Sequence, residues 1–264
     1  MKLSRILLVI TLPFSVVSMF LMILAFSTAY HPGISNYFES SSPLPVLSVL
    51  FVCLAIAVGI AAAFVSHFRN QPLSIPTTPS FALLPASIGT LASAILLFIA
   101  GKTLTGILFL AEATFFALLI CPFVKKYAAF AIWGGFAAIA AQIVLISRYY
   151  FDMTLEMNAP VKVLLQMGLL AAMLDCTVEI RLLIGRSHAL LTPILTVFTF
   201  STCLLSGFST LALTLDSEMP NMVYIAAMPA LIGFSSTALC RLMQILNPSL
   251  PVSPNQNEKE EDAE

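Results

Sequence analysis

Long apolar segments dominate this chain and restrict what it can fold into. Eight of them are bounded by polar or proline-containing stretches, and a helix of about 20 residues is enough to cross the hydrocarbon core of a bilayer. They cover residues 5–28, 44–66, 81–101, 104–124, 127–147, 160–184, 188–214 and 220–247. Only Lys102-Thr103 joins the third to the fourth, which predicts a tight helical hairpin. Because helices satisfy their own backbone groups in lipid, the pattern predicts an all-α bundle of about eight transmembrane helices.

The charge content excludes several classes of protein. Charged residues make up 9% of the 264 residues and hydrophobic residues 59%, whereas a soluble domain carries about 25% charged residues. The net charge of −1 argues against nucleic acid as a partner, because phosphate binding needs clustered Lys and Arg. We therefore expect a multi-pass protein with the lipid bilayer as its solvent, and its compact loops favour a bacterial plasma membrane.

The N-terminus imitates a signal peptide. Lys2 and Arg5 form a basic start, and Ser27-Thr28-Ala29 resembles a cleavage site. The apolar run over residues 6–26 is, however, longer than the ~7–15 residues of a signal sequence. We expect an uncleaved first span.

Basic residues predict the orientation of the spans. If the N-terminus is inside, nine of the twelve Lys and Arg residues lie on the cytoplasmic side, and three lie on the other. The nine are Lys2, Arg5, Arg69, Lys125, Lys126, Arg181, Arg186, Arg241 and Lys259; the three are Lys102, Arg148 and Lys162. By the positive-inside rule we expect an N-in, C-in topology. Residues 1–250 then form a single polytopic domain, and the acidic stretch 251–264 is predicted to be a disordered cytoplasmic tail.

The motifs of catalysis and metal binding are missing from the sequence. The five cysteines form no CxxC pair, and the chain contains no HExxH, glycine-rich phosphate loop or GxSxG. We therefore expect no cofactor and no metal, and we assign no catalytic residue.

Three acids lie inside the apolar segments: Glu112 in the fourth, and Asp175 and Glu179 in the sixth. An ionisable residue near the middle of a bilayer costs about 2.5–3.5 kcal/mol on insertion scales, so it indicates a function or a partner. With a helical rise of 1.5 Å per residue, Glu112 lies roughly 18 Å and Asp175 roughly 15 Å from the inner ends of their spans.

Two serines of the eighth span lie at a comparable depth. If Ser235 and Ser236 converge with Glu112 and Asp175, the four residues would form an intramembrane polar site in which one of the two acids holds a proton, because like charges disfavour double ionisation. The alternative is that each acid is satisfied separately by a neighbouring helix. Depth alone does not show which faces point at one another.

Glu179 lies closer to the inner end of its span, at a depth similar to that of Arg241 in the eighth span. Charges within spans tend to pair with one another. We predict a structural ion pair between Glu179 and Arg241.

Three functions fit these observations. The acids at matched depth favour a small permease or carrier, whose partners would be a small solute and a proton or cation. The scarcity of polar residues fits a non-catalytic membrane subunit or scaffold for a protein partner at the cytoplasmic face. An intramembrane enzyme that uses Glu112 and Asp175 as acid and base ranks last, because no nucleophile accompanies them.

Overall fold

The computed structural model describes residues 3–30, 37–68, 81–121, 128–185, 190–215 and 222–246. These residues form eight helices that are long and apolar enough to cross a membrane, so this part of the prediction is confirmed. The helices are α1 (Leu3–Ala29), α2 (Leu44–Phe68), α3 (Leu84–Ile99), α4 (Thr103–Ile120), α5 (Ala128–Phe151), α6 (Pro160–Leu183), α7 (Leu191–Leu215) and α8 (Met222–Leu246), with the short 3-10 helix η1 (Phe81–Leu83) before α3. The tail 251–264 and the basic residues Lys2, Arg69, Lys125, Lys126, Arg186 and Lys259 lie outside the described residues.

A tight turn joins α3 to α4, as the short polar link between the two segments predicts. Gly101 adopts a positive φ of 71°, a conformation that a glycine reaches without strain. The N–H of Lys102 then donates to the carbonyl of Leu97 at 2.8 Å and closes the end of α3.

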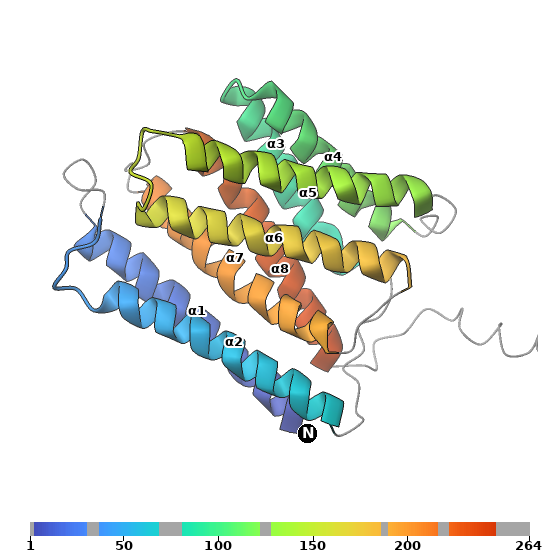
Figure 1. Cartoon of the computed structure of the whole chain (residues 1–264), viewed down its shortest axis with the longest axis horizontal. Coiled ribbons are helices and arrows are strands. Elements are labelled where there is room, and N and C mark those ends of the chain that lie inside the picture. The colour runs from blue at the N-terminus through green and yellow to red at the C-terminus, as the bar shows by residue number, and fades with distance from the viewer. Residues whose placement is uncertain are drawn as a thin grey trace, which may run out of the picture.

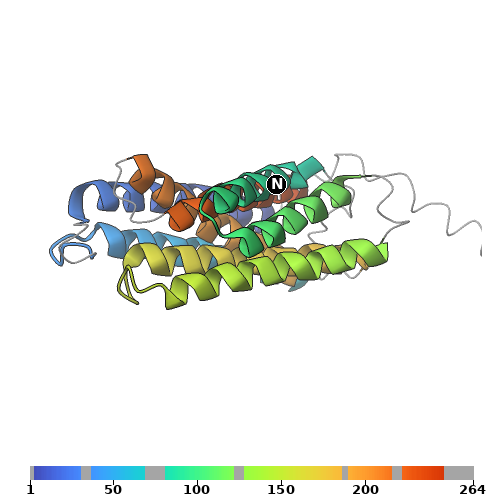
Figure 2. The ribbon, with the colours of Figure 1, turned by 90° about the horizontal axis from the view of Figure 1, so that it is seen from above.

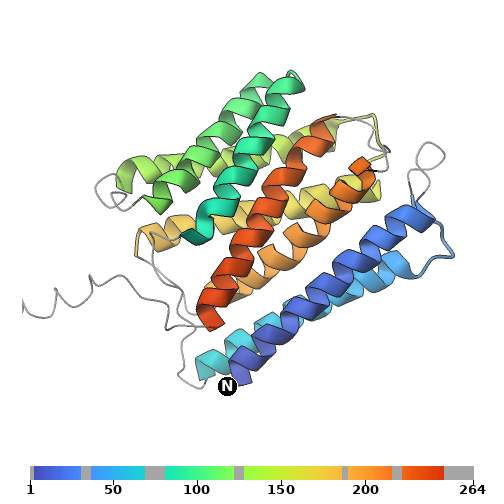
Figure 3. The same ribbon diagram turned by 180° about the vertical axis from the view of Figure 1, so that it is seen from behind.

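Six of the helices form a closed ring. From α3 to α8 each helix packs against the next, and α8 packs back against α3, so that it lies between α3 and α7 (Figure 3). The α1–α2 hairpin is docked on the outside of this ring, mainly against α7 (Figure 1). Seen from above, the helices run side by side along a common direction (Figure 2). The ring therefore surrounds its interior laterally with helices.

Small and hydroxyl side chains dock the hairpin on α7. The Ser15 hydroxyl of α1 lies 2.8 Å from the Ser201 hydroxyl of α7. Gly59 of α2 lies directly against the side chain of Val197. Because lipid tails are as apolar as these helices, such close contacts and interhelical hydrogen bonds favour association within a membrane.

Helices α3 and α8 cross at a motif that both of them carry. The motif is a proline, a glycine four residues later and a hydroxyl residue four residues after that: Pro85, Gly89 and Ser93 in α3, and Pro229, Gly233 and Thr237 in α8. At the crossing Gly89 lies opposite Gly233, and a Cβ atom on either glycine would collide with the carbonyl oxygen of the proline on the other helix. The lack of a side chain on both glycines therefore lets the two backbones approach closely.

The two hydroxyl residues complete this crossing by satisfying backbone N–H groups beside the prolines. Pro229 has no N–H and disturbs the hydrogen bonds around it, and the N–H of Ala230 donates instead to Ser93 Oγ at 2.9 Å. Ala86 lies in the first turn of α3, where N–H groups have no acceptor within the helix, and it donates to Thr237 Oγ1 at 3.1 Å. These reciprocal bonds close the ring between α8 and α3.

We predict that Gly89→Ala and Gly233→Ala each lower the free energy of unfolding by about 1–3 kcal/mol, because the new methyl group forces the two backbones apart. Denaturant unfolding in detergent micelles measures this. Gly134→Ala is the matched control, since a Cβ at that glycine would lie 3.3 Å from the side chain of Phe115 and meet no backbone carbonyl. An equal loss of stability in all three variants would contradict the close crossing.

Candidate functional site

Four buried ionisable side chains come from three helices, α4, α6 and α8. Glu112 is 0% exposed, Asp175 3%, Glu179 1% and Arg241 2%. Three carboxyl groups therefore accompany one guanidinium group in this part of the bundle. A buried charge is costly unless it is paired and hydrogen-bonded, so the partners of each acid decide what it can do.

Lys162 is also buried, but it lies at the opposite end of α6. Its Nζ donates to the backbone carbonyls of Asp152 at 2.6 Å and Leu155 at 3.3 Å. Burial disfavours the charge of Asp152, but hydrogen bonds from Thr154 and the charge of Lys162 together lower the pKa of this carboxyl. Lys162 is about 20 Å along the helix from Asp175 at 1.5 Å per residue. It thus holds the loop between α5 and α6 and does not neutralise the buried acids.

Glu112 is held between three helices. The Nε2 of Gln142, on α5, donates to both carboxyl oxygens at 2.7 and 2.9 Å. The Cys176 thiol of α6 lies 3.6 Å from Oε1. Phe115 and Phe116, on the same helix, are fully buried beside it in sequence. Glu112 therefore joins α4, α5 and α6 through polar contacts in an otherwise apolar region.

The pairing with Gln142 suits more than one protonation state of Glu112. A carboxamide has two N–H donors and a carbonyl acceptor. In this structure one amide nitrogen binds the carboxyl group, while Gln142 Oε1 is buried and has no hydrogen-bond partner among the described residues. If Glu112 is protonated, a turned amide can accept its O–H. The local contacts therefore stabilise the position of Glu112 whether or not it carries a proton.

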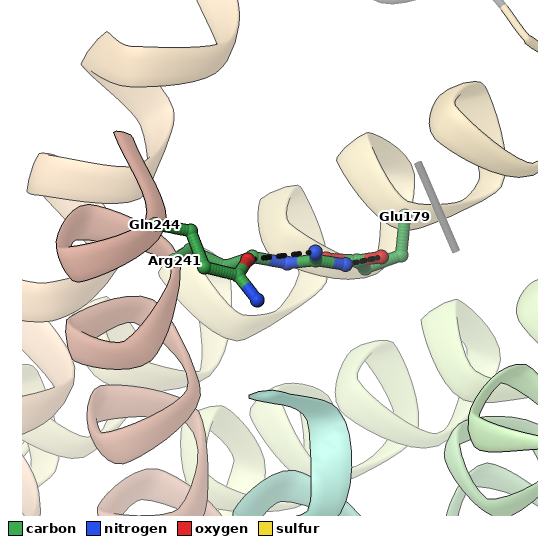
Figure 4. Close-up of polar contacts among 3 residues, drawn as sticks. All are labelled: Glu179, Arg241 and Gln244. Carbon is green, nitrogen blue, oxygen red and sulfur yellow. Dashed lines mark hydrogen bonds and ion pairs between the residues drawn. The ribbon is translucent and has the colours of Figure 1, made fainter. Parts of the chain in front are cut away.

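Glu179 and Arg241, the two residues expected to pair, form a buried ion pair between α6 and α8. Arg241 Nη2 lies 2.7 Å from Glu179 Oε2, and Nε lies 3.0 Å from Oε1. Figure 4 shows the guanidinium reaching from α8 to the carboxylate, with Gln244 beside it, whose Oε1 accepts from Nη1 at 3.3 Å. Such a two-pronged contact has the geometry of a strong Arg–carboxylate pair. The charge of Glu179 is thus neutralised within the bundle.

Asp175 lies one helical turn before Glu179 and is differently placed. Its Oδ2 is buried and has no hydrogen-bond partner within the described part of the chain. Arg241 is close enough for its charge to act on Asp175, while its Nε and Nη2 donate to Glu179. Like charges on Asp175 and Glu179 disfavour each other. Asp175 is therefore the acid whose charge this interior satisfies least.

The two deepest acids have separate surroundings. Cys176 contacts Glu112, and Asp175 is its neighbour in sequence. Successive residues on a helix point about 100° apart, so Asp175 leaves α6 in a different direction, on the side of Glu179. Within the described residues no hydrogen bond joins Glu112 to Asp175. The structure thus places Glu112 in a contact among α4, α5 and α6, and Asp175 on the side of α6 that meets α8 through Glu179 and Arg241.

The two serines of the expected site lie on α8. Ser235 is 2% exposed and Ser236 is partly buried. Both hydroxyls donate to the carbonyl of Ile232 in their own helix at 2.9 Å. Across the described ranges neither serine has a hydrogen bond to Glu112 or Asp175, so these serines serve α8 rather than the acids.

Gln142 is the polar partner of Glu112 that reasoning from the sequence missed. It is a carboxamide inside an apolar span, and it is 0% exposed. Polar residues in such a position usually bind another helix, so its presence was a usable signal, although its partner could not be read from the sequence. Cys176, which belongs to no motif of the sequence, also contacts Glu112 through its thiol.

No protein-family model, no curated protein and no solved structure matches this chain. The functional argument therefore rests on the geometry of the buried polar groups.

The ion pair predicts a non-additive pair of substitutions. Arg241→Met leaves the Glu179 carboxylate buried without its partner and should cost about 3–5 kcal/mol of unfolding free energy. The double variant Glu179→Leu/Arg241→Met removes both charges and should recover most of this loss, because well-packed apolar residues replace a buried pair at little cost. Unfolding in micelles measures all variants of the cycle. Additive losses would show that the two charges do not interact.

Proposed function

We propose that this protein is a small permease or carrier of a cell membrane, which couples the movement of a solute to a proton or small cation bound at an acid near the middle of the bundle. Eight apolar helices support a multi-pass protein. The distribution of basic residues supports an orientation with both termini on the cytoplasmic side. Ionisable residues in such helices commonly mark ion and substrate pathways.

The observation that carries the proposal is the unsatisfied carboxyl of Asp175. Glu179 and Arg241 neutralise one another at 2.7 Å, and Glu112 is held by Gln142 and Cys176. Asp175 Oδ2 has no hydrogen-bond partner among the described residues. A structural acid would be expected to have its lone pairs satisfied. An acid that binds and releases a cation must instead keep an oxygen available for it.

The energetics of this site give a means of coupling. When Asp175 is ionised, its charge adds to that of Glu179 in a region that contains one nearby cation, Arg241. A bound proton or cation removes that excess charge. The protein with Asp175 occupied therefore differs in stability from the protein with Asp175 empty. A ligand shifts the equilibrium between two conformations only through such a difference. A closed ring whose helices repack around this site can then expose it to either side of the membrane in turn.

We predict that Asp175→Asn abolishes coupled uptake. Proteoliposomes loaded with a pH-sensitive dye receive a panel of sugars, amino acids and organic ions, and a transported solute of the native protein acidifies the lumen. The Asn variant keeps the size of the side chain but cannot take up a proton, so solute-dependent acidification should fall to that of empty liposomes.

Glu39→Gln is the control for the loss of an acid, because Glu39 is exposed in the link between α1 and α2. Unaltered coupled uptake by Asp175→Asn would remove this acid from the mechanism. If the native protein moves none of the solutes and purifies with a stable protein partner, a role as a membrane subunit replaces the carrier.

A further inference from the structure

A row of buried polar side chains runs along one side of α7. Its members recur at intervals of three and four residues, so they occupy one face of the helix. We name this face the hydroxyl seam; it consists of Thr196, Thr199, Cys203, Ser206 and Thr210. All five are between 0% and 2% exposed. The seam spans about 21 Å of helix at 1.5 Å per residue.

The hydroxyl seam faces the side of α6 that carries Asp175. The Thr199 hydroxyl donates to the carbonyl of Ala171 at 3.3 Å, and the Cys203 thiol to that of Gly168 at the same distance. Gly168 and Ala171 are followed by Asp175 at the same three- and four-residue spacing, so all three share one face of α6.

The register of these contacts sets the level of Asp175. The partners of Ala171 and Gly168 show that α6 and α7 run antiparallel. Asp175, one turn beyond Ala171, therefore lies level with the start of the seam at Thr196. From there the seam continues toward the end of α7 at Leu215.

The seam offers acceptors rather than donors. The hydroxyls of Thr196, Ser206 and Thr210 each donate to the carbonyl four residues earlier in α7, at 2.8, 2.7 and 2.7 Å. A hydroxyl group has one proton to donate and two lone pairs that accept. Because the proton is already used, the free lone pairs favour a positively charged species. Together with a carboxylate, such oxygen atoms suit a proton or a hard monovalent cation.

We infer that Asp175 and the hydroxyl seam of α7 form the binding site and access route of a small monovalent cation, a proton or a sodium ion, and that Glu112 does not exchange with solvent. This inference rests on the proposed carrier function for its purpose, but the site itself is defined by the contacts of α6 and α7. Two observations distinguish the acids. Asp175 has a buried oxygen with no hydrogen-bond partner among the described residues, whereas both oxygens of Glu112 accept from Gln142.

The charged and titratable groups around Asp175 come from three helices. Glu179 lies on the same helix and Arg241 on α8. The Cys203 thiol of α7 lies close enough to be affected by the charge of Asp175. On the side of α5 the polar residue is Gln142, which does not titrate and binds Glu112. Occupancy of the site therefore depends on the charge of Asp175 within the field of a closed Glu179–Arg241 pair.

The test is labelling of the purified protein with dicyclohexylcarbodiimide, which needs no substrate. A protonated carboxyl group transfers its proton to a carbodiimide nitrogen while its oxygen bonds to the central carbon, and an acyl shift then yields a stable N-acylurea that mass spectrometry locates. We expect the adduct on Asp175, with a rate that falls as the pH rises, and none on Glu112. Asp175→Asn should remove the label.

Salt and seam variants sharpen the test. Labelling that is equal in sodium chloride and choline chloride assigns the site to a proton, and protection by sodium assigns it to both ions in competition. Thr199→Val with Ser206→Ala should slow labelling at least tenfold, because carbodiimide reacts with the protonated acid and an apolar seam no longer relays a proton to Asp175. Ser201→Ala is the matched control, since its hydroxyl lies on another face of α7 against Ser15. Thermal unfolding verifies that each variant is folded.

Three results would overturn the inference: an adduct on Glu112 in place of Asp175, no adduct on either acid, or seam variants that are labelled at the native rate. Labelling as expected in a protein that transports no solute would instead retain the cation site and remove the carrier function.

Discussion

A guanidinium group inside a membrane bundle needs a counter-charge from the protein, and Arg241 obtains it from Glu179 at 2.7 Å. This pair ties α6 to α8 across the ring. It also directs Nε and Nη2 of the guanidinium to Glu179. Asp175, one turn away, is left with a buried oxygen that accepts no hydrogen bond from the described chain. The ion pair and the unpaired buried oxygen of Asp175 are therefore two consequences of the same arrangement.

The arrangement depends in turn on how closely the helices approach. At the crossing of α3 and α8, Gly89 meets Gly233, and Ser93 and Thr237 satisfy backbone N–H groups of the opposite helix. Lipid supplies no hydrogen bonds, so these groups must be satisfied within the protein. The crossing closes the ring, and the closed ring separates the buried acids from lipid. Hydroxyl groups thus stabilise the crossing of α3 and α8, and one on α7, that of Thr199, binds a backbone carbonyl of α6.

The sequence allowed some of these features to be predicted and concealed others. The length of the apolar segments and the polar residues between them predicted the helices, because both can be read from residues that are neighbours in the sequence. The depths of Glu179 and Arg241 predicted their contact, because opposite charges at one level have few other partners in lipid. Depth did not reveal that Glu112 of α4 contacts α5 and α6, whereas Asp175 lies on the side of α6 that meets α8, since the rotation of a helix is set by packing with distant segments. The shared motif of Pro85 and Pro229 is visible in the sequence, but nothing local indicates that its two copies meet.

The central claim is that Asp175 holds a cation that exchanges with solvent while Glu112 does not. Infrared difference spectroscopy of the protein in liposomes, between acidic and alkaline buffer, measures this directly through the C=O stretch of a protonated carboxyl group. Our account predicts a band that appears on acidification, disappears in Asp175→Asn and persists in Glu112→Gln. A band that survives in Asp175→Asn and is lost in Glu112→Gln would contradict it.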